Sequence, residues 1–217
     1  MNLKILSLLI IEVCILLPDV CYAFFSKDVH LLNMQNGLAD NTVSAVYKDK
    51  EGFVWFGTRN GLSRYDGRRI TNFERSRSYP SISNLKEVFD GVLAFVDNGV
   101  FSAFDLKKER FLSVVSSSGQ GIPSRGMLQR NDSLVWVISG SELHLMKRCA
   151  SKEGELRLRV QEKYTGWNNQ DNLLVAITYS SDKKSICLID EKGRIILLDA
   201  TNLNSFRVID LGRTGSL

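Results

Sequence analysis

Residues 36–73 read NGLADNTVSAVYKDKEGFVWFGTRNGLSRYDGRRITNF and decide the fold. Four apolar runs lie in this stretch, at residues 43–47, 53–56, 62–65 and 70–73. The segments between the runs are Asp49-Lys50-Glu51-Gly52, Arg59-Asn60-Gly61 and Asp66-Gly67. Asn-Gly and Asp-Gly pairs favour tight hairpin turns, because these residues adopt positive φ at little cost. The stretch therefore predicts one meander of four antiparallel strands.

The pattern of residues 36–73 also resembles a known repeat, that of the two-component regulator propeller family. This repeat typically reads G-L, then N-x-V, then D-x-x-G-x-x-W-x-G-T-x-x-G-L-x-R-Y-D-G, and ends in Phe. The matching positions here are Gly37, Leu38, Asn41, Val43, Asp49, Gly52, Trp55, Gly57, Thr58, Gly61, Leu62, Arg64, Tyr65, Asp66, Gly67 and Phe73. The resemblance covers one blade and implies a structural role for these motif residues.

The resemblance carries expectations about function. Such repeats are found mainly in the periplasmic sensor regions of bacterial hybrid two-component systems, many of which govern polysaccharide use. The resemblance therefore implies a ligand-sensing segment that is not an enzyme, uses no cofactor and responds to an oligosaccharide. Its implied partners are the remaining propeller blades and a kinase module of the same system, neither of which we expect within these 217 residues.

The first 23 residues have the features of a signal peptide. Lys4 precedes an apolar run at residues 5–17, and Cys21-Tyr22-Ala23 supplies a small residue for cleavage. The run is shorter than the roughly 20 residues that span a bilayer. We therefore expect cleavage after Ala23 and export to the periplasm, with an uncleaved membrane anchor as the alternative.

The four-strand pattern recurs along the rest of the chain with decreasing similarity to the first unit. A second unit places Asn98-Gly99 between the apolar runs 92–96 and 100–105. A third centres on residues 134–138, and a fourth on residues 185–189. The blades are predicted at approximately residues 36–75, 82–115, 125–162 and 172–211.

The second strand of each unit favours a β-propeller over a sandwich. Residues 53–56 and 134–138 are apolar at successive positions, so both faces of these strands should be buried. A blade packed between two neighbours meets that requirement. The polar alternation of residues 156–160 instead predicts an outer edge strand. The predicted fold is all-β, with about four blades of a propeller.

Four blades are fewer than the seven with which propellers of the resembled family close, so we expect an incomplete propeller. The leading interpretation is the N-terminal piece of a longer sensor or a truncated product. The alternative is a stand-alone secreted propeller that serves as a binding or scaffold module and closes its ring by itself or as a homodimer.

Charge and cysteine content exclude little beyond nucleic acid as a partner. The chain carries 28 Lys and Arg against 24 Asp and Glu, and this mild surplus does not indicate nucleic-acid binding. Cys149 and Cys187 are the two cysteines outside the leader. In an exported protein they either form a disulfide or stay as two buried thiols, and the thiols are favoured.

Single titratable and aromatic residues are more readily explained by structure than by catalysis. His30 and His144 are interpreted as structural, and no Cys/His cluster has metal-ligand spacing. The five aspartates at hairpin positions should cap their own turns; they are Asp49, Asp66, Asp97, Asp105 and Asp190. Trp167 has polar neighbours, so we expect it to be exposed, either stacking on a ligand or packing at an edge.

A ligand site is predicted on the face that carries the turns between second and third strands and the links between blades. The candidate residues are Arg59, Asn60, Arg75, Arg77, Tyr79 and Asn98. The three arginines among them would form a basic rim suited to carboxylated or sulfated sugars. The alternative is an ordinary solvated surface.

Overall fold

The structure is a computed structural model that describes residues 30–74, 82–167 and 172–210. Residues 33–217 form one compact unit, and the fold described here belongs to it. The predicted signal peptide, residues 1–23, lies outside the described residues. Within the described ranges, no helix has the length and apolar character to cross a membrane.

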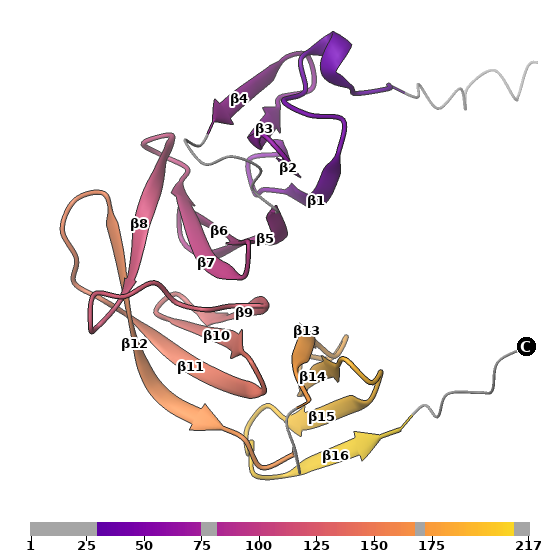
Figure 1. The fold of residues 1–217 in the computed structure, drawn as a ribbon, viewed down its shortest axis with the longest axis vertical. Coiled ribbons are helices and arrows are strands. Elements are labelled where there is room, and N and C mark those ends of the chain that lie inside the picture. Colours follow the sequence, from indigo (N-terminus) through magenta and orange to yellow (C-terminus); the bar gives the residue numbers. More distant parts are fainter. Residues whose placement is uncertain (1–29, 75–81, 168–171, 211–217) are drawn as a thin grey trace, which may run out of the picture. The chain divides into compact units, whose positions relative to one another are not determined.

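The described residues form sixteen strands, grouped into four successive antiparallel meanders (Figure 1). The first meander follows the short 3-10 turn η2 (Met34–Asn36) and comprises β1 (Val43–Lys48), β2 (Val54–Thr58), β3 (Gly61–Tyr65) and β4 (Ile70–Glu74). The second comprises β5 (Ile82–Phe89), β6 (Val92–Asp97), β7 (Val100–Asp105) and β8 (Arg110–Ser116). The third comprises β9 (Gly126–Asn131), β10 (Leu134–Ser139), β11 (Glu142–Cys149) and β12 (Glu155–Tyr164). The fourth comprises β13 (Leu174–Tyr179), β14 (Ser185–Asp190), β15 (Ile195–Asp199) and β16 (Phe206–Ile209).

Motif residues hold the β2–β3 turn and the segment that leads into β1. Thr58 is fully buried, and its hydroxyl donates to the Gly61 carbonyl at 3.0 Å. Gly61 has a φ of +121°, a value that side-chain-bearing residues rarely adopt. The Asn41 side chain accepts a hydrogen bond from the Met34 amide at 2.9 Å. The motif therefore specifies the backbone geometry of the segment before β1 and of the turn after β2.

Two further motif residues close the β3–β4 turn. The Asp66 carboxylate accepts hydrogen bonds from the amides of Arg68 and Arg69 at 2.7 and 2.6 Å. The Tyr65 hydroxyl donates to the Gly67 carbonyl at 2.8 Å. These backbone hydrogen bonds lower the pKa of Asp66 below its ordinary value. The predicted capping role of Asp66 is therefore confirmed.

Two aspartates of the later blades follow the same rule. Asp105 accepts from the amides two and three residues further on, at 3.0 Å each. Asp190 accepts from the Lys192 and Arg194 amides at 3.0 and 2.9 Å. Burial would raise the pKa of Asp190, but the hydrogen bonds from Arg194 hold it below the ordinary value. Asp97 is as buried as Asp190, each with 2% of its surface exposed, and its capping role stays a prediction.

The first two blades approach each other closely at Gly57 on β2. A Cβ atom at this position would lie 2.5 Å from Cγ2 of Ile82, the first residue of β5. The hydroxyl of Ser44 on β1 donates a hydrogen bond to the Ile82 carbonyl in the same place. Only glycine leaves room for this contact, which explains why the motif has glycine here.

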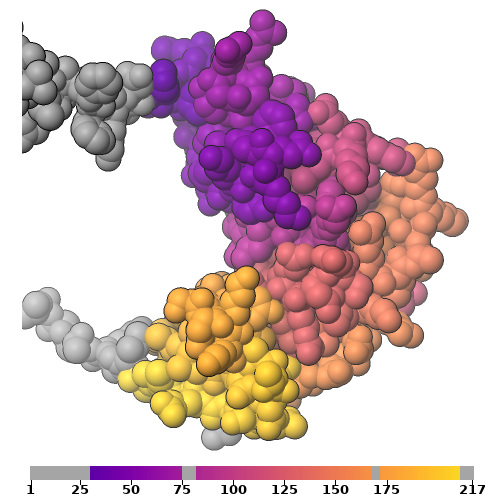
Figure 2. Space-filling model, turned by 180° about the vertical axis from the view of Figure 1, so that it is seen from behind, coloured from indigo at the N-terminus to yellow at the C-terminus, as the bar shows by residue number. Residues whose placement is uncertain are grey.

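The second blade is packed on both flanks, as its apolar second strand predicts. On β6, Leu93 and Phe95 belong to a buried cluster that also contains Trp55 of the first blade. Ala94 and Val96, on the opposite face, belong to a different cluster that extends into the third blade. Figure 2 shows the second and third blades, magenta and salmon, in contact at the surface. All residues of β6 are buried as a result.

The third blade repeats this arrangement. Val135 and Val137 of β10 contribute to the cluster shared with the second blade. Trp136 and Ile138, which alternate with them, join a cluster that contains Leu188 and its neighbours in the fourth blade. The prediction that residues 134–138 are buried on both faces is confirmed for all but Leu134, which is half-buried.

In the first and fourth blades the large apolar residues of the second strand are fully buried on one face only. Trp55 is 1% exposed, whereas Val54 and Phe56 beside it are half-buried. On β14 the buried residues alternate with half-buried ones, and Ile189 is 37% exposed. The expectation that residues 53–56 are buried on both faces is therefore wrong, because the described residues provide a neighbouring blade on one side of β2.

The outer strands of the second and third blades pair with each other. β8 and β12 run parallel, with Leu156 opposite Val114 and Leu158 opposite Ser116, so the two blades form one eight-stranded sheet. The prediction of a free edge strand at residues 156–160 is therefore wrong. Its polar alternation has another cause, since Leu156 and Leu158 face the core while Arg157 and Arg159 face outward.

Candidate functional site

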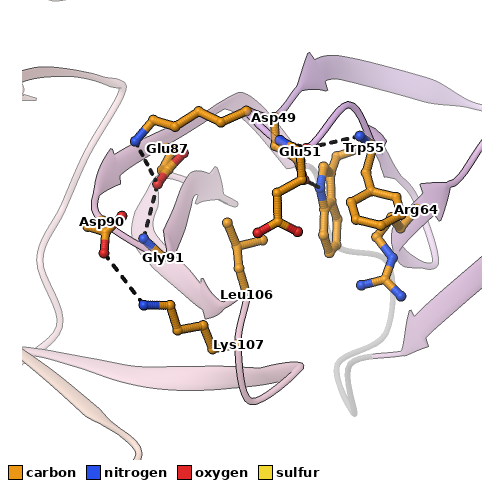
Figure 3. A pocket seen from close by; sticks show the side chains of 11 residues that line it. Asp49, Glu51, Trp55, Arg64, Glu87, Asp90, Gly91, Leu106 and Lys107 are labelled. Atoms are coloured by element: carbon orange, nitrogen blue, oxygen red, sulfur yellow. Dashed lines mark hydrogen bonds and ion pairs between the residues drawn. The ribbon is translucent and has the colours of Figure 1, made fainter.

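A cleft of 190 Å³ lies between the first and second blades, on the side of the β1–β2 turn (Figure 3). Its walls come from the β1–β2 turn with β2, from β3, from the end of β5 with the β5–β6 turn, and from the segment after β7. The residues that line it are Asp49, Lys50, Glu51, Phe53, Trp55, Arg64, Glu87, Asp90, Gly91, Leu106 and Lys107. Apolar side chains form part of the lining and charged side chains the rest.

Asp49 and Trp55 form the fixed wall of the cleft. One Asp49 oxygen, Oδ1, accepts hydrogen bonds from the amides of Glu51 and Phe53 at 3.0 and 2.9 Å. The other, Oδ2, accepts from the indole Nε1 of Trp55 at 2.8 Å. The predicted turn cap is thus confirmed, and the same carboxylate also satisfies the polar atom of a buried tryptophan. The motif D-x-x-G-x-x-W therefore encodes one hydrogen-bonded unit.

Arg64 connects this wall to the second blade. Its guanidinium carbon lies 4.8 Å from the ring centre of Phe53 and 5.5 Å from those of Trp55 and Phe73. A cation stacked on aromatic faces in this way gains electrostatic stabilisation from the rings. The guanidinium also pairs with Glu109 of the β7–β8 turn at 2.6 Å. The Arg64 charge is therefore already matched within the protein.

Two lysines that line the cleft, Lys50 of the first blade and Lys107 of the second, pair with carboxylates of the second blade. Lys50 Nζ lies 3.4 Å from Glu87 Oε1, and the same oxygen accepts a hydrogen bond from the Gly91 amide at 3.0 Å. The Glu87 carboxylate raises the pKa of Lys50 above its ordinary value. Lys107 lies 3.6 Å from Asp90, and both side chains are largely exposed. Such exposed pairs contribute little to stability and can exchange partners readily.

Glu51 is the one carboxylate of the lining that has no side-chain partner among the described residues. Glu51 is exposed, and in Figure 3 its carboxylate points into the cleft. An ionised carboxylate is an acceptor for hydroxyl or ammonium groups. The cleft can therefore bind a small polar molecule through hydrogen bonds. Within the described ranges no three His, Cys, Asp or Glu residues are grouped to hold a metal ion.

The residues predicted to bind a ligand lie elsewhere or outside the described ranges. Arg59 is exposed on the β2–β3 turn, and Asn98 is exposed on the β6–β7 turn. The Asn60 side chain donates to the Ala39 carbonyl at 3.1 Å and so also has a structural role. Arg75, Arg77 and Tyr79 lie outside the described residues. The basic rim stays a prediction.

Other candidates are settled by their surroundings. Trp167 is 6% exposed and packs against Phe206, with ring centres 6.5 Å apart. The expected exposure of Trp167 is therefore wrong, and of its two expected roles this contact fits edge packing. His144 is buried, and its Nε2 lies 2.6 Å from Glu142, whose pKa this hydrogen bond lowers. Cys149 and Cys187 are free thiols, each partly rather than fully buried.

Sequence reasoning missed the cleft itself. Arg64 belongs to the quoted motif, but Glu87 on β5, Asp90 in the β5–β6 turn and Lys107 after β7 lie outside the stretch that resembles the repeat. The topology could have indicated the cleft, because successive blades bring the turns that follow their first and third strands to the same end of the propeller. The predicted ligand residues were drawn from the turns at the other end of the strands.

Comparison with known proteins identifies the class of fold. The extracellular domain of a putative one component system from B. thetaiotaomicron has a TM-score of 0.61 at 15% identity, over 83% of this chain and 27% of that one. The extracellular domain of a putative hybrid two component system from the same organism has a TM-score of 0.58 at 17% identity, over 86% and 26%. The β-propeller domain of Cps50 (Swd1) from Myceliophteria thermophila has a TM-score of 0.54 at 16% identity, over 77% and 55%. The chain is thus an all-β segment of propeller blades.

Residues 37–60 match the family model described as two component regulator propeller. The first blade therefore carries a repeat of that kind. No curated protein matches the sequence. The chain spans less than a third of the length of the two B. thetaiotaomicron chains that it resembles. At these identities the similarity to solved structures establishes the fold.

Proposed function

We propose that this chain is a segment of a periplasmic ligand-sensing β-propeller of a hybrid two-component regulatory system. The observation that carries the proposal is the repeat at residues 37–60, which lies in a blade with all four strands and all three turns formed. The similarity to two extracellular sensor domains supports it. The remaining blades and the kinase module would be supplied by the rest of that system.

The proposed stimulus is a sugar released from a polysaccharide, and the proposed role is binding without chemical change. Propellers usually bind ligands through the turns at one end of their strands, where loops of successive blades meet. The cleft between the first two blades is such a place, with exposed hydrogen-bonding groups above apolar side chains. Signal transfer would then use a change in how neighbouring blades or partner domains pack.

The proposal predicts that the full chain binds at least one polysaccharide-derived oligosaccharide and releases it intact. Titration calorimetry against neutral, amine-bearing and acidic oligosaccharides would show saturable binding to one class. Chromatography of the sugar after long incubation would then recover it uncleaved. Failure of every class to bind would contradict the sensing role, and accumulation of shorter products would contradict the non-enzymatic role.

A further inference from the structure

We propose that the cleft between the first and second blades binds a single sugar unit that carries no negative charge, with the Glu51 carboxylate as its main acceptor. This inference rests on the proposed function and adds the place of binding and the class of ligand. It differs from the basic rim predicted at Arg59, Arg75 and Arg77, which would favour acidic sugars and would use the opposite end of the strands.

The size and lining of the cleft suit one sugar unit. A volume of 190 Å³ is below the roughly 300–1,000 Å³ that is typical of sites for drug-sized ligands. Phe53 and Leu106 supply apolar surface, Trp55 lies behind them with 1% of its surface exposed, and the remaining lining residues are polar except for Gly91. A sugar unit combines apolar C–H faces with a rim of hydroxyl groups, so it complements a lining of this mixed kind.

The charges in the cleft disfavour an anion. Four lining residues are carboxylates and three are cations. Each cation already has a partner: Lys50 pairs with Glu87, Lys107 pairs with Asp90, and Arg64 pairs with Glu109 outside the lining. An entering carboxylate or sulfate would have to compete with the carboxylates of these pairs. It would also lie near the unmatched charge of Glu51, which is repulsive.

Glu51 is placed to receive a donor. The backbone of the β1–β2 turn is held by the hydrogen bonds that Asp49 accepts, so the backbone at Glu51 is positioned before a ligand arrives. Its carboxylate has no partner of its own among the described residues and points into the cleft (Figure 3). Hydroxyl or ammonium groups of a sugar can donate to it, and such charge-assisted hydrogen bonds are the stronger kind.

The test compares Glu51→Gln with Glu191→Gln in the full chain. Glu191 is an exposed glutamate on the β14–β15 turn and does not line the cleft, so its substitution removes the same charge elsewhere. Calorimetry would measure the affinity of each variant for neutral, amine-bearing and acidic oligosaccharides of equal length. Thermal melts of both variants would verify that each is folded.

We expect neutral or amine-bearing sugars to bind and Glu51→Gln to weaken them about tenfold to a hundredfold, the loss of a hydrogen bond to a charged group. Glu191→Gln should bind like the unsubstituted chain. Equal affinity in Glu51→Gln would overturn the assignment of the site while leaving the sensing role intact. If the chain instead prefers an acidic sugar and Arg59→Ala abolishes that binding, the site lies at the basic rim and not in the cleft. Absence of binding by all three classes would overturn the proposed function together with this inference.

Discussion

Replacing Trp55 by alanine is expected to lower the free energy of unfolding by about 3–5 kcal/mol. The indole is 1% exposed, and its ring centre lies 5.6 Å from that of Phe73 and 5.5 Å from that of Phe104 in the second blade. Its removal would therefore leave a cavity where the two blades meet. A loss of this size is a large part of the 5–15 kcal/mol that stabilises a typical domain. Urea unfolding followed by circular dichroism measures it.

Phenylalanine substitutions separate the packing of the indole from its hydrogen bond. Trp55→Phe loses the hydrogen bond to Asp49, whereas the Nε1 of Trp136 has no partner among the described residues. Both indoles are 1% exposed, so the two substitutions remove similar buried surface. Trp55→Phe should therefore be more destabilising than Trp136→Phe by about 1 kcal/mol or more. Equal losses, or a smaller loss at Trp55, would show that the Asp49–Trp55 pair does not stabilise the blade.

The second large effect is expected at Gly57, where alanine should destabilise the protein by about 1–3 kcal/mol and valine by more. The new Cβ would lie 2.5 Å from Cγ2 and 3.1 Å from Cβ of Ile82, which is fully buried. Gly121→Ala is the matched control, because its Cβ would meet Val100 at an ordinary 3.7 Å. Thermal and urea unfolding of both variants measures the difference.

A double-mutant cycle connects this cost to the contact between blades. In an Ile82→Ala background, the Gly57→Ala substitution should cost markedly less, because the clashing Cγ2 atom is absent. The same cost in both backgrounds would mean that Gly57 is required for the conformation of its own strand rather than for the approach of β5.

Turn chemistry made most of the fold predictable from the sequence. Asp66-Gly67 and Asn98-Gly99 mark hairpins because their conformational preferences are local, and the strands between such turns follow from the apolar runs. The succession of apolar residues at 134–138 indicated burial on both faces, which the packing of Val137 and Trp136 into different clusters explains.

Features that depend on two blades at once were not predictable in the same way. The alternation of residues 156–160 fits a free edge as well as the parallel pairing with β8, because both leave one face outward. The burial of Trp167 depends on Phe206, which is distant in sequence. The cleft beside Trp55 likewise requires the β5–β6 turn, and no property of residues 36–73 specifies what that turn supplies.

Acrylamide quenching of the unsubstituted protein tests the packing of the blades most directly, because the chain has three tryptophans and all three are buried. Trp55 lies between the first and second blades, and Trp136 lies between the third and fourth. The account predicts blue-shifted emission and weak quenching in the native protein, with a large rise in quenching on unfolding in urea. Native quenching as efficient as that of the unfolded chain would contradict it.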